Sequence, residues 1–320
     1  MLDWEAAIAN NATQPILVLR YEDIKETSER AMPLVKYRDA GGDTLLVLEV
    51  DGYLYPKTPE EVVRGIKDVT IRDDDVMICA YPKSGTHWVW EITRCILSGT
   101  TDLVVAEKDE LHLECIPNST LETFASPRIL NCHIWYRQLP GQFTQKNCKI
   151  IFVSRNPKDV AVSFFHHHKK LTQYYEYTGK WENYLPLFLN GQVDSGSWFE
   201  YMLDWEAAIA NNATQPILVL RYEDIEENPQ REVSKIARFL DKDCTAEFLS
   251  QVCDKCDFRN MKRTKGHIIT SLDDKNDSVM YRKGQVGDWK NYFTVAQNEV
   301  FDRVFAEKMK QSSMKFKYEL

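Results

Sequence analysis

The sequence predicts an α/β fold: a single domain with a central parallel β-sheet flanked by helices and a P-loop-like phosphate-binding strand-turn-helix. Short, unbroken apolar runs alternate with amphipathic helical segments along the chain. The runs have no polar side, which is typical of parallel strands that helices cover on both faces. No linker rich in proline, glycine or serine divides this pattern. We therefore expect one domain over residues 31–320.

The N-terminal segment stands apart from this pattern, because residues 1–24 repeat residues 202–225 without a single difference. Repeat architectures stack several units that have diverged, so two identical copies do not fit that pattern. In the second copy, residues 216–220 predict a buried central strand, and an amphipathic helix through Phe239 follows. We interpret residues 1–30 as a duplicated extension outside the core. A docked or swapped segment is the alternative.

The other elements follow from local patterns of apolar and turn residues. In chain order they are a β-hairpin at residues 44–55 that turns at Asp51-Gly52, a strand at residues 75–80, a helix at residues 87–97, a strand at residues 149–153 and a helix from Lys158. The strand-turn-helix order occurs twice, which predicts right-handed crossovers between parallel strands.

Composition argues against several classes of protein. The formal net charge of −8 argues against a nucleic-acid-binding surface. No apolar stretch approaches the ~18 residues of a membrane span, so no membrane partner is expected. The N-terminus lacks a basic region followed by an apolar one, so we expect a cytoplasmic protein with reduced cysteines. Cys253-x-x-Cys256 has no second pair beside it, so we expect no metal.

The first strand-to-helix turn carries the residues of an anion site, in the order Tyr-Pro-Lys-Ser-Gly-Thr-His-Trp at residues 81–88. Backbone N–H groups at the start of a helix attract anions, and the hydroxyls of Ser84 and Thr86 and the ammonium of Lys83 add to them. The lysine precedes Gly85, so this is not a Walker A loop. A tight turn with incidental polar residues is the alternative.

Two further segments are basic. In the second strand-to-helix turn, Asn156 is placed to cap a helix, Pro157 stands at its first position, and Arg155 and Ser163 lie near its start. A guanidinium there suits a phosphate bidentately. Residues 281–290 combine cations with two glycines, which let a backbone approach an anion. A capped surface helix and a solvated basic turn are the alternatives.

Together, these three segments resemble, in order and approximate spacing, the segments of cytosolic sulfotransferases that bind 3′-phosphoadenosine 5′-phosphosulfate (PAPS). The resemblance runs from about Lys36 to Leu320. It implies sulfuryl transfer from PAPS to a small acceptor, with PAP as product. The binding residues that it implies are Lys83, Ser84, Gly85, Thr86, His87 and Trp88 for the 5′-phosphosulfate, Arg155, Ser163, Arg282, Lys283 and Gly284 for the 3′-phosphate, and Trp88, Tyr222 and Phe258 for adenine.

The resemblance also implies the catalytic residues. His133, at the end of an apolar strand, falls on the general base, and a histidine can take a proton near neutral pH. Lys83 would stabilise the charge of the leaving phosphate. Four positions depart from the family's pattern: Asn131 stands where many relatives have a lysine, Trp135 where a proline is usual, Cys256 where a hydroxyl residue is frequent, and His87 where a threonine or an asparagine often follows the first threonine.

Two other motifs have open interpretations. Adjacent helical side chains diverge by about 100°, so His166, His167 and His168 cannot all face one metal, and we expect one of them to line the acceptor pocket. Residues 290–299 match a short dimerisation motif of the family and predict a homodimer. A helix cap at Thr294 is the alternative.

Other functions remain open. A nucleotide-dependent kinase shares a phosphate loop, but the Walker A order and a clear Mg²⁺-binding aspartate are missing from the sequence. A catalytically weak protein that binds PAPS or a small ligand would share the fold, and so would an enzyme that sulfates an alcohol only to expel it. The aromatic residues Trp135, Tyr136, Phe143, Tyr174, Tyr175 and Tyr177 favour a flat apolar acceptor such as a phenol.

Overall fold

The computed structural model describes residues 33–102, 107–212, 214–266, 278 and 280–320. The N-terminal copy of the repeated segment lies outside the described residues, so the interpretation of residues 1–30 stays a prediction. The second copy forms the end of α11, the strand β7 and the beginning of α12.

The strands and helices are, in chain order, β1 (Leu34–Arg38), β2 (Thr44–Val50), β3 (Tyr53–Tyr55), α3 (Glu60–Gly65), β4 (Val76–Ala80), α4 (Thr86–Ser98), α5 (Glu107–Glu110), α6 (Asn118–Leu121), β5 (Ile129–Cys132), α7 (Gln142–Lys146), β6 (Lys149–Ser154), α8 (Pro157–Lys170), α9 (Thr172–Tyr175), α10 (Trp181–Leu189), α11 (Trp198–Asn211), β7 (Ile217–Arg221), α12 (Tyr222–Glu227), α13 (Pro229–Phe239), α14 (Ala246–Lys255), α15 (Phe258–Lys265) and α16 (Val295–Lys308).

The central sheet has the order β5-β4-β6-β7, and all of its strands are parallel. Cys79 of β4 lies opposite both Cys132 of β5 and Phe152 of β6. Every residue of β4 is buried, as expected for a strand that is covered on both faces. The predicted α/β fold with a central parallel sheet is therefore confirmed.

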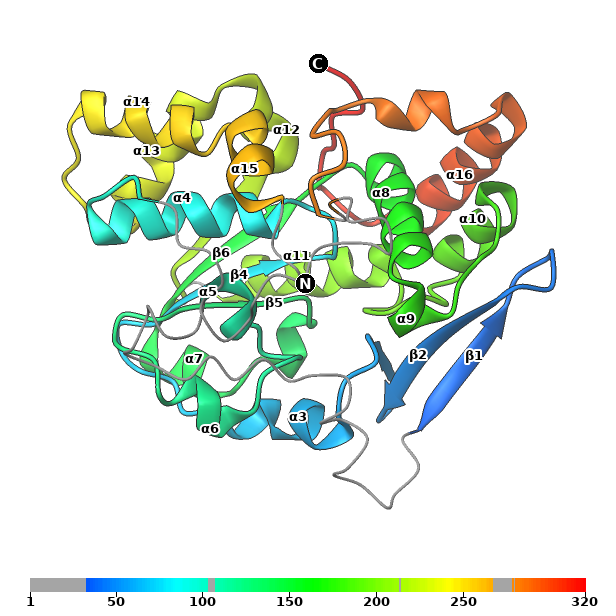
Figure 1. Ribbon diagram of the computed structural model, residues 1–320, viewed down its shortest axis with the longest axis horizontal. Coiled ribbons are helices and arrows are strands. Elements are labelled where there is room, and N and C mark those ends of the chain that lie inside the picture. The colour runs from blue at the N-terminus through cyan, green and yellow to red at the C-terminus, as the bar shows by residue number, and fades with distance from the viewer. Residues whose placement is uncertain (1–32, 103–106, 213, 267–277, 279) are drawn as a thin grey trace, which may run out of the picture. The chain divides into compact units, whose positions relative to one another are not determined.

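Helices flank this sheet (Figure 1). The helix α4 lies on one side of it together with α13, α14 and α15, and the indole of Trp90 on α4 donates a hydrogen bond of 2.8 Å to the Ile129 carbonyl of β5. The helix α11 packs on β6, where Trp205 stacks on Phe152 with ring centroids 4.6 Å apart. None of the described helices is long and apolar enough to span a bilayer.

Residues 216–220 were predicted to form a buried central strand, and the prediction that this strand is central is wrong. The strand β7 forms, but it is the last strand of the described sheet beyond β6, and Val219 is 42% exposed. An apolar run identifies a strand, but it does not show whether the strand has one neighbour or two.

The predicted hairpin is confirmed, and it gains a third strand that the sequence did not predict. The strands β2 and β3 pair in antiparallel fashion across Asp51-Gly52, where both residues have a positive φ. The strand β1 pairs with the other edge of β2. The carboxylate of Asp39 holds the turn between them, because it accepts the N–H groups of Gly41 and Asp43.

Parallel pairing brings the ends of neighbouring strands to one edge of the sheet. The turn after β4 leads into α4, β5 ends directly before His133, and the turn after β6 leads into α8. This edge is where ligands bind in open α/β sheets. The residues predicted to act on a ligand therefore come together there.

Candidate functional site

The turn between β4 and α4 forms a strained loop around the start of the helix. Lys83 and Gly85 have φ values of 67° and 101°, in the left-handed region. A Cβ atom on Gly85 would lie 2.8 Å from the ring of Tyr222, so only glycine fits there. Among the described residues, the buried hydroxyls of Ser84 and Thr86 have no hydrogen-bond partner. Together with the N-terminus of α4, they form a site for an anion.

Three cationic side chains from the three predicted segments meet beside this loop. Arg155 connects the β4–α4 turn with the loop of residues 281–290, because its guanidinium donates to the carbonyls of Lys83 at 2.9 Å and Gln285 at 3.2 Å. Burial, and then the charge of Arg155, lower the pKa of Lys83 to about 7, and Arg282 contributes in the same direction. The Nε atoms of Arg155 and Arg282 are buried and have no partner among the described residues. Cations that repel one another in a buried site favour an anionic ligand. We call Lys83, Arg155 and Arg282 the cation group.

A carboxylate of α8 holds the loop of residues 281–290 against that helix, and a second carboxylate binds cations within the loop. Asp159, in the first turn of α8, accepts the N–H groups of Gly287 at 2.7 Å and Trp289 at 2.9 Å. Arg282 and Lys283 both form ion pairs of 2.7 Å with Asp288. The predicted helix start is confirmed as well, since Asn156 caps α8 by accepting the N–H of Asp159.

Aromatic side chains line the space next to the cation group. Trp88 and Tyr222 meet edge to face with ring centroids 5.4 Å apart, and the Arg155 guanidinium lies 4.1 Å from the Tyr222 ring. In the loop of residues 281–290, a Cβ atom on Gly284 would lie 2.2 Å from the ring of Phe258. Ser163 is half-buried on α8, and no hydrogen bond among the described residues joins it to the cation group.

His133 is held in one tautomer. Its Nδ1 lies 2.7 Å from the carbonyl oxygen of Ala80. Because a carbonyl only accepts, Nδ1 carries the proton and Nε2 keeps its lone pair. Burial, and then the charge of Lys108, lower the pKa of His133 to about 3, so the imidazole is neutral at neutral pH. The backbone N–H of His133 donates to the buried carboxylate of Glu114.

Sequence reasoning missed the segment that packs against this histidine, which contains Lys108, His112 and Glu114. Asn131 fastens it to β5, because its side-chain amide donates to the carbonyls of Lys108 at 2.8 Å and Leu111 at 3.0 Å. The rings of His112 and His133 have centroids 5.0 Å apart. The sequence of this segment shows no helical or strand period, so the pattern of its residues did not predict where it lies. The departure at Asn131 was the one hint of a local difference.

The remaining histidines have separate surroundings. His87 Nε2 lies 3.3 Å from a carboxylate oxygen of Asp109, and burial, then Lys108, lower the pKa of His87 to about 4. His166 is 2.8 Å from the Tyr292 hydroxyl, whereas His168 is bound between Tyr184 and Asp194. These partners lie in different directions, as the helical spacing predicted.

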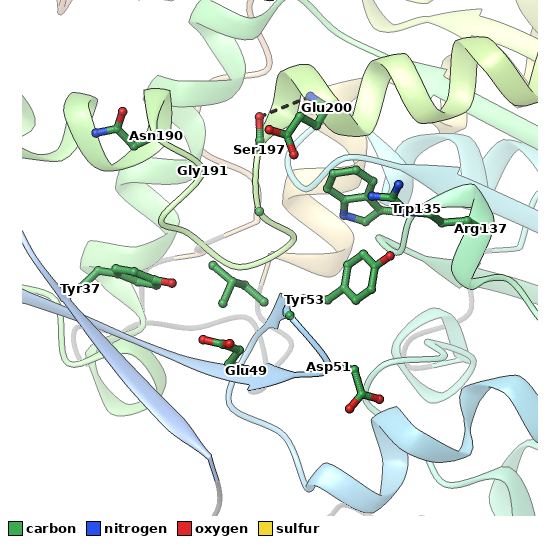
Figure 2. A pocket seen from close by; sticks show the side chains of 13 residues that line it. Tyr37, Glu49, Asp51, Tyr53, Trp135, Arg137, Asn190, Gly191, Ser197 and Glu200 are labelled. Carbon is green, nitrogen blue, oxygen red and sulfur yellow. Dashed lines mark hydrogen bonds between the residues drawn. The ribbon is translucent and has the colours of Figure 1, made fainter.

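A surface pocket of about 470 Å³ lies elsewhere, between the β2–β3 hairpin and the residues before α11. Figure 2 shows Glu49, Asp51 and Glu200 around it, with Arg137 beside Trp135. His133 and the cation group do not line it. Its carboxylates would repel an anionic donor, so we place the candidate site at the sheet edge and not in this pocket.

Comparisons with known proteins place the chain among sulfotransferases. Residues 73–313 match the family of the sulfotransferase domain. Sulfotransferase 1B1 of the dog (Canis lupus familiaris) is 38% identical, and the match covers 78% of this chain and 88% of that protein. Sulfotransferase 1A1 of the rat (Rattus norvegicus) is 35% identical over 86% and 98% of the two chains. The crystal structure of mouse sulfotransferase SULT7A1 complexed with PAP has 33% identity and a TM-score of 0.71, and the match covers 83% of this chain and 96% of that one.

Proposed function

Because the chain belongs to the sulfotransferase family, we propose that PAPS is its donor and that it transfers the sulfuryl group in line to a hydroxyl or amine of a small, aromatic acceptor. The observation that carries the proposal is the partly buried cation group beside the unpartnered hydroxyls of Ser84 and Thr86. The mouse sulfotransferase that was crystallised with PAP supports the choice of donor.

The residues present fit a nucleotide with phosphates at two positions. The loop of residues 83–88 would hold the 5′-phosphosulfate with its N–H groups and hydroxyls. Arg155, Ser163, Arg282, Lys283 and Gly284 would hold the 3′-phosphate, and the ion pairs of Arg282 and Lys283 with Asp288 already hold these cations in position. Trp88, Tyr222 and Phe258 offer ring faces and edges to adenine.

His133 acts as the general base in this proposal. Its Nε2 takes the proton of the acceptor hydroxyl while the hydroxyl oxygen forms a bond to sulfur, and the bond from sulfur to the donor phosphate breaks. Lys83, as an ammonium, stabilises the negative charge that collects on the phosphate oxygen. The side chain of Asn131 is bound to backbone carbonyls. Lys108, and not residue 131, supplies the positive charge that acts most strongly on the pKa of His133.

Two alternatives receive less support. A nucleotide-dependent kinase would not explain why cations from three separate segments converge on one site. A catalytically weak protein that only binds PAPS or a small ligand would not require the fixed tautomer of His133. A homodimer formed through residues 290–299 and a cytoplasmic location remain part of the proposal. Val295 is 78% exposed and therefore accessible to a partner.

The test is the transfer of ³⁵S from labelled PAPS to phenols, alcohols and amines, with PAP binding measured in parallel. The intact chain, a form that lacks residues 1–30 and His133→Ala are compared. We expect labelled product from the first two forms, and PAP binding without product from His133→Ala. PAP binding with no transfer by the intact chain would support the binding-protein alternative, and analysis of the products separates sulfation from net dehydration.

A further inference from the structure

Two buried polar atoms next to His133 have no hydrogen-bond partner among the described residues. They are Nε2 of His112 and Oε2 of Glu114, which lie 3.7 Å apart. Their residues are 8% and 2% exposed. This distance is too long for a direct hydrogen bond. Buried polar groups are nearly always paired, so a polar group of a ligand or a water belongs between these two atoms.

The surroundings define which atom donates and which accepts. Nδ1 of His112 lies 3.0 Å from the sulfur of Cys115. Burial raises the pKa of Cys115, so the thiol keeps its proton and is able to donate it to Nδ1. Burial, and then Lys108, lower the pKa of His112, so the ring is neutral, and the tautomer that accepts from this thiol carries its single proton on Nε2. Oε1 of Glu114 already accepts the N–H of His133, and burial raises the pKa of Glu114 to about 7, so above pH 7 the carboxylate is charged and Oε2 is left as the acceptor.

One N–H donor and one carboxylate acceptor therefore lie 3.7 Å apart, next to the ring that would accept the reacting proton. A hydroxyl matches this pair, because it accepts from Nε2 and donates to Oε2. An ether oxygen cannot donate, and an ammonium cannot accept. We propose that His112 and Glu114 bind a second hydroxyl of the acceptor, adjacent to the hydroxyl that is sulfated. The preferred acceptors are then vicinal diols of the catechol type.

This inference rests on the proposed sulfuryl transfer, and it is tested with three acceptors that differ at one position: phenol, catechol and 2-methoxyphenol. Transfer from ³⁵S-labelled PAPS gives kcat/KM for each. We expect the wild-type chain to prefer catechol to 2-methoxyphenol and to phenol by roughly tenfold or more, since one hydrogen bond to a charged group is gained.

Substitutions at His112 and Glu114 test whether these two residues cause the preference for catechol. Glu114→Gln keeps a carbonyl oxygen for the His133 N–H but replaces the acceptor, and His112→Phe removes the donor. Each should reduce the ratio of catechol to phenol toward one, mainly through KM, whereas His112→Gln, whose amide still donates, should restore part of it. Glu200→Gln removes a carboxylate from the separate pocket in Figure 2 and should leave the ratio at its wild-type value.

The outcomes separate the inference from the function on which it rests. Transfer to all three acceptors at equal kcat/KM would overturn the inference, because the pair then binds only water, and the proposed function would stand. A ratio that changes in Glu200→Gln but not in Glu114→Gln would also overturn it, because the preference would belong to the other pocket. Failure to transfer to any acceptor would refute the proposed function, and the inference with it.

Discussion

The half-buried ammonium of Lys83 should give donor binding a dependence on pH. Its pKa is lowered to about 7, so in the ligand-free protein Lys83 loses its proton as the pH rises through 7. An anion favours the charged form, so PAP binding should take up a proton at pH 8. The Kd for PAP should then rise by up to about tenfold for each pH unit above 7. Calorimetry in buffers of different ionisation enthalpy measures this uptake.

Lys83→Arg is the matched control, because a guanidinium stays charged throughout this range. Its affinity for PAP should show much less change between pH 7 and 9. Binding of PAP to the wild-type chain with no proton uptake at pH 8 would contradict the lowered pKa of Lys83.

As the proposed base, His133 should remain active in acid to an unusually low pH. The neutral ring is the active form of a base, and a pKa of about 3 keeps it neutral as the pH falls from 7 to 5. We expect kcat/KM to show no acid limb from this residue in that range. In Lys108→Met, a positive charge is lost, so the pKa of His133 rises and an acid limb moves toward neutral pH.

The rate at each pH, for Lys108→Met and for Lys146→Met, measures this effect. Lys146 forms an ion pair with Asp73, so its removal is the control and should not move the limb. If the acid limb of kcat/KM lies at the same pH in both variants, Lys108 does not act on His133.

At the scale of single residues, the sequence predicted the side chains that lie at the ends of strands. Lys83, Arg155 and His133 each follow an apolar run that predicts a strand, so their meeting at one sheet edge followed from the fold. Lys108, His112 and Glu114 could not be predicted in this way. They lie in and after the short helix α5, where position depends on contacts such as those of Asn131.

At the scale of elements, α4 offers a controlled test of its two ends. It is preceded by Gly85 and followed by Gly99, and both glycines have a positive φ. Gly85→Ala should cost about 1 kcal/mol of stability from backbone strain and weaken PAP binding about tenfold or more, because the new methyl group displaces Tyr222. Gly99→Ala has open space around it, so it should cost similar stability and leave PAP binding unchanged.

Thermal unfolding and PAP titration of both variants measure these two effects. Equal PAP affinity in the two variants would show that the contact between Gly85 and Tyr222 does not shape the site.

The strands and helices that the sequence predicted are those with a clear period or an unbroken apolar run, such as β4, β6 and α8. The strand β1 was missed because a turn at Gly41-Gly42 and pairing with β2 define it. The position of β7 was wrong because strand order depends on long-range pairing, which local pattern does not encode.

At the scale of the whole molecule, the proposed homodimer can be tested at one exposed side chain. Val295 follows the N-cap Thr294 of α16, which is bonded reciprocally with Gln297, so the helix-cap interpretation of Thr294 is confirmed. Val295→Glu should abolish dimerisation and change the melting temperature little, because Val295 is 78% exposed. Sedimentation at several concentrations measures the mass. A wild-type chain that is monomeric throughout would refute the dimer.

The hydrogen bond between His133 and Ala80 has a consequence for turnover. Because Nδ1 is bound to a carbonyl that cannot take its proton, the proton gained at Nε2 has to leave from Nε2 as well. In the proposed reaction that nitrogen would face the sulfated product, so the base would be regenerated only when the product has moved away. An imidazolium with a depressed pKa is a strong acid and loses its proton as soon as water reaches it. Product release, and not proton loss, would therefore reset the proposed catalyst for the next cycle.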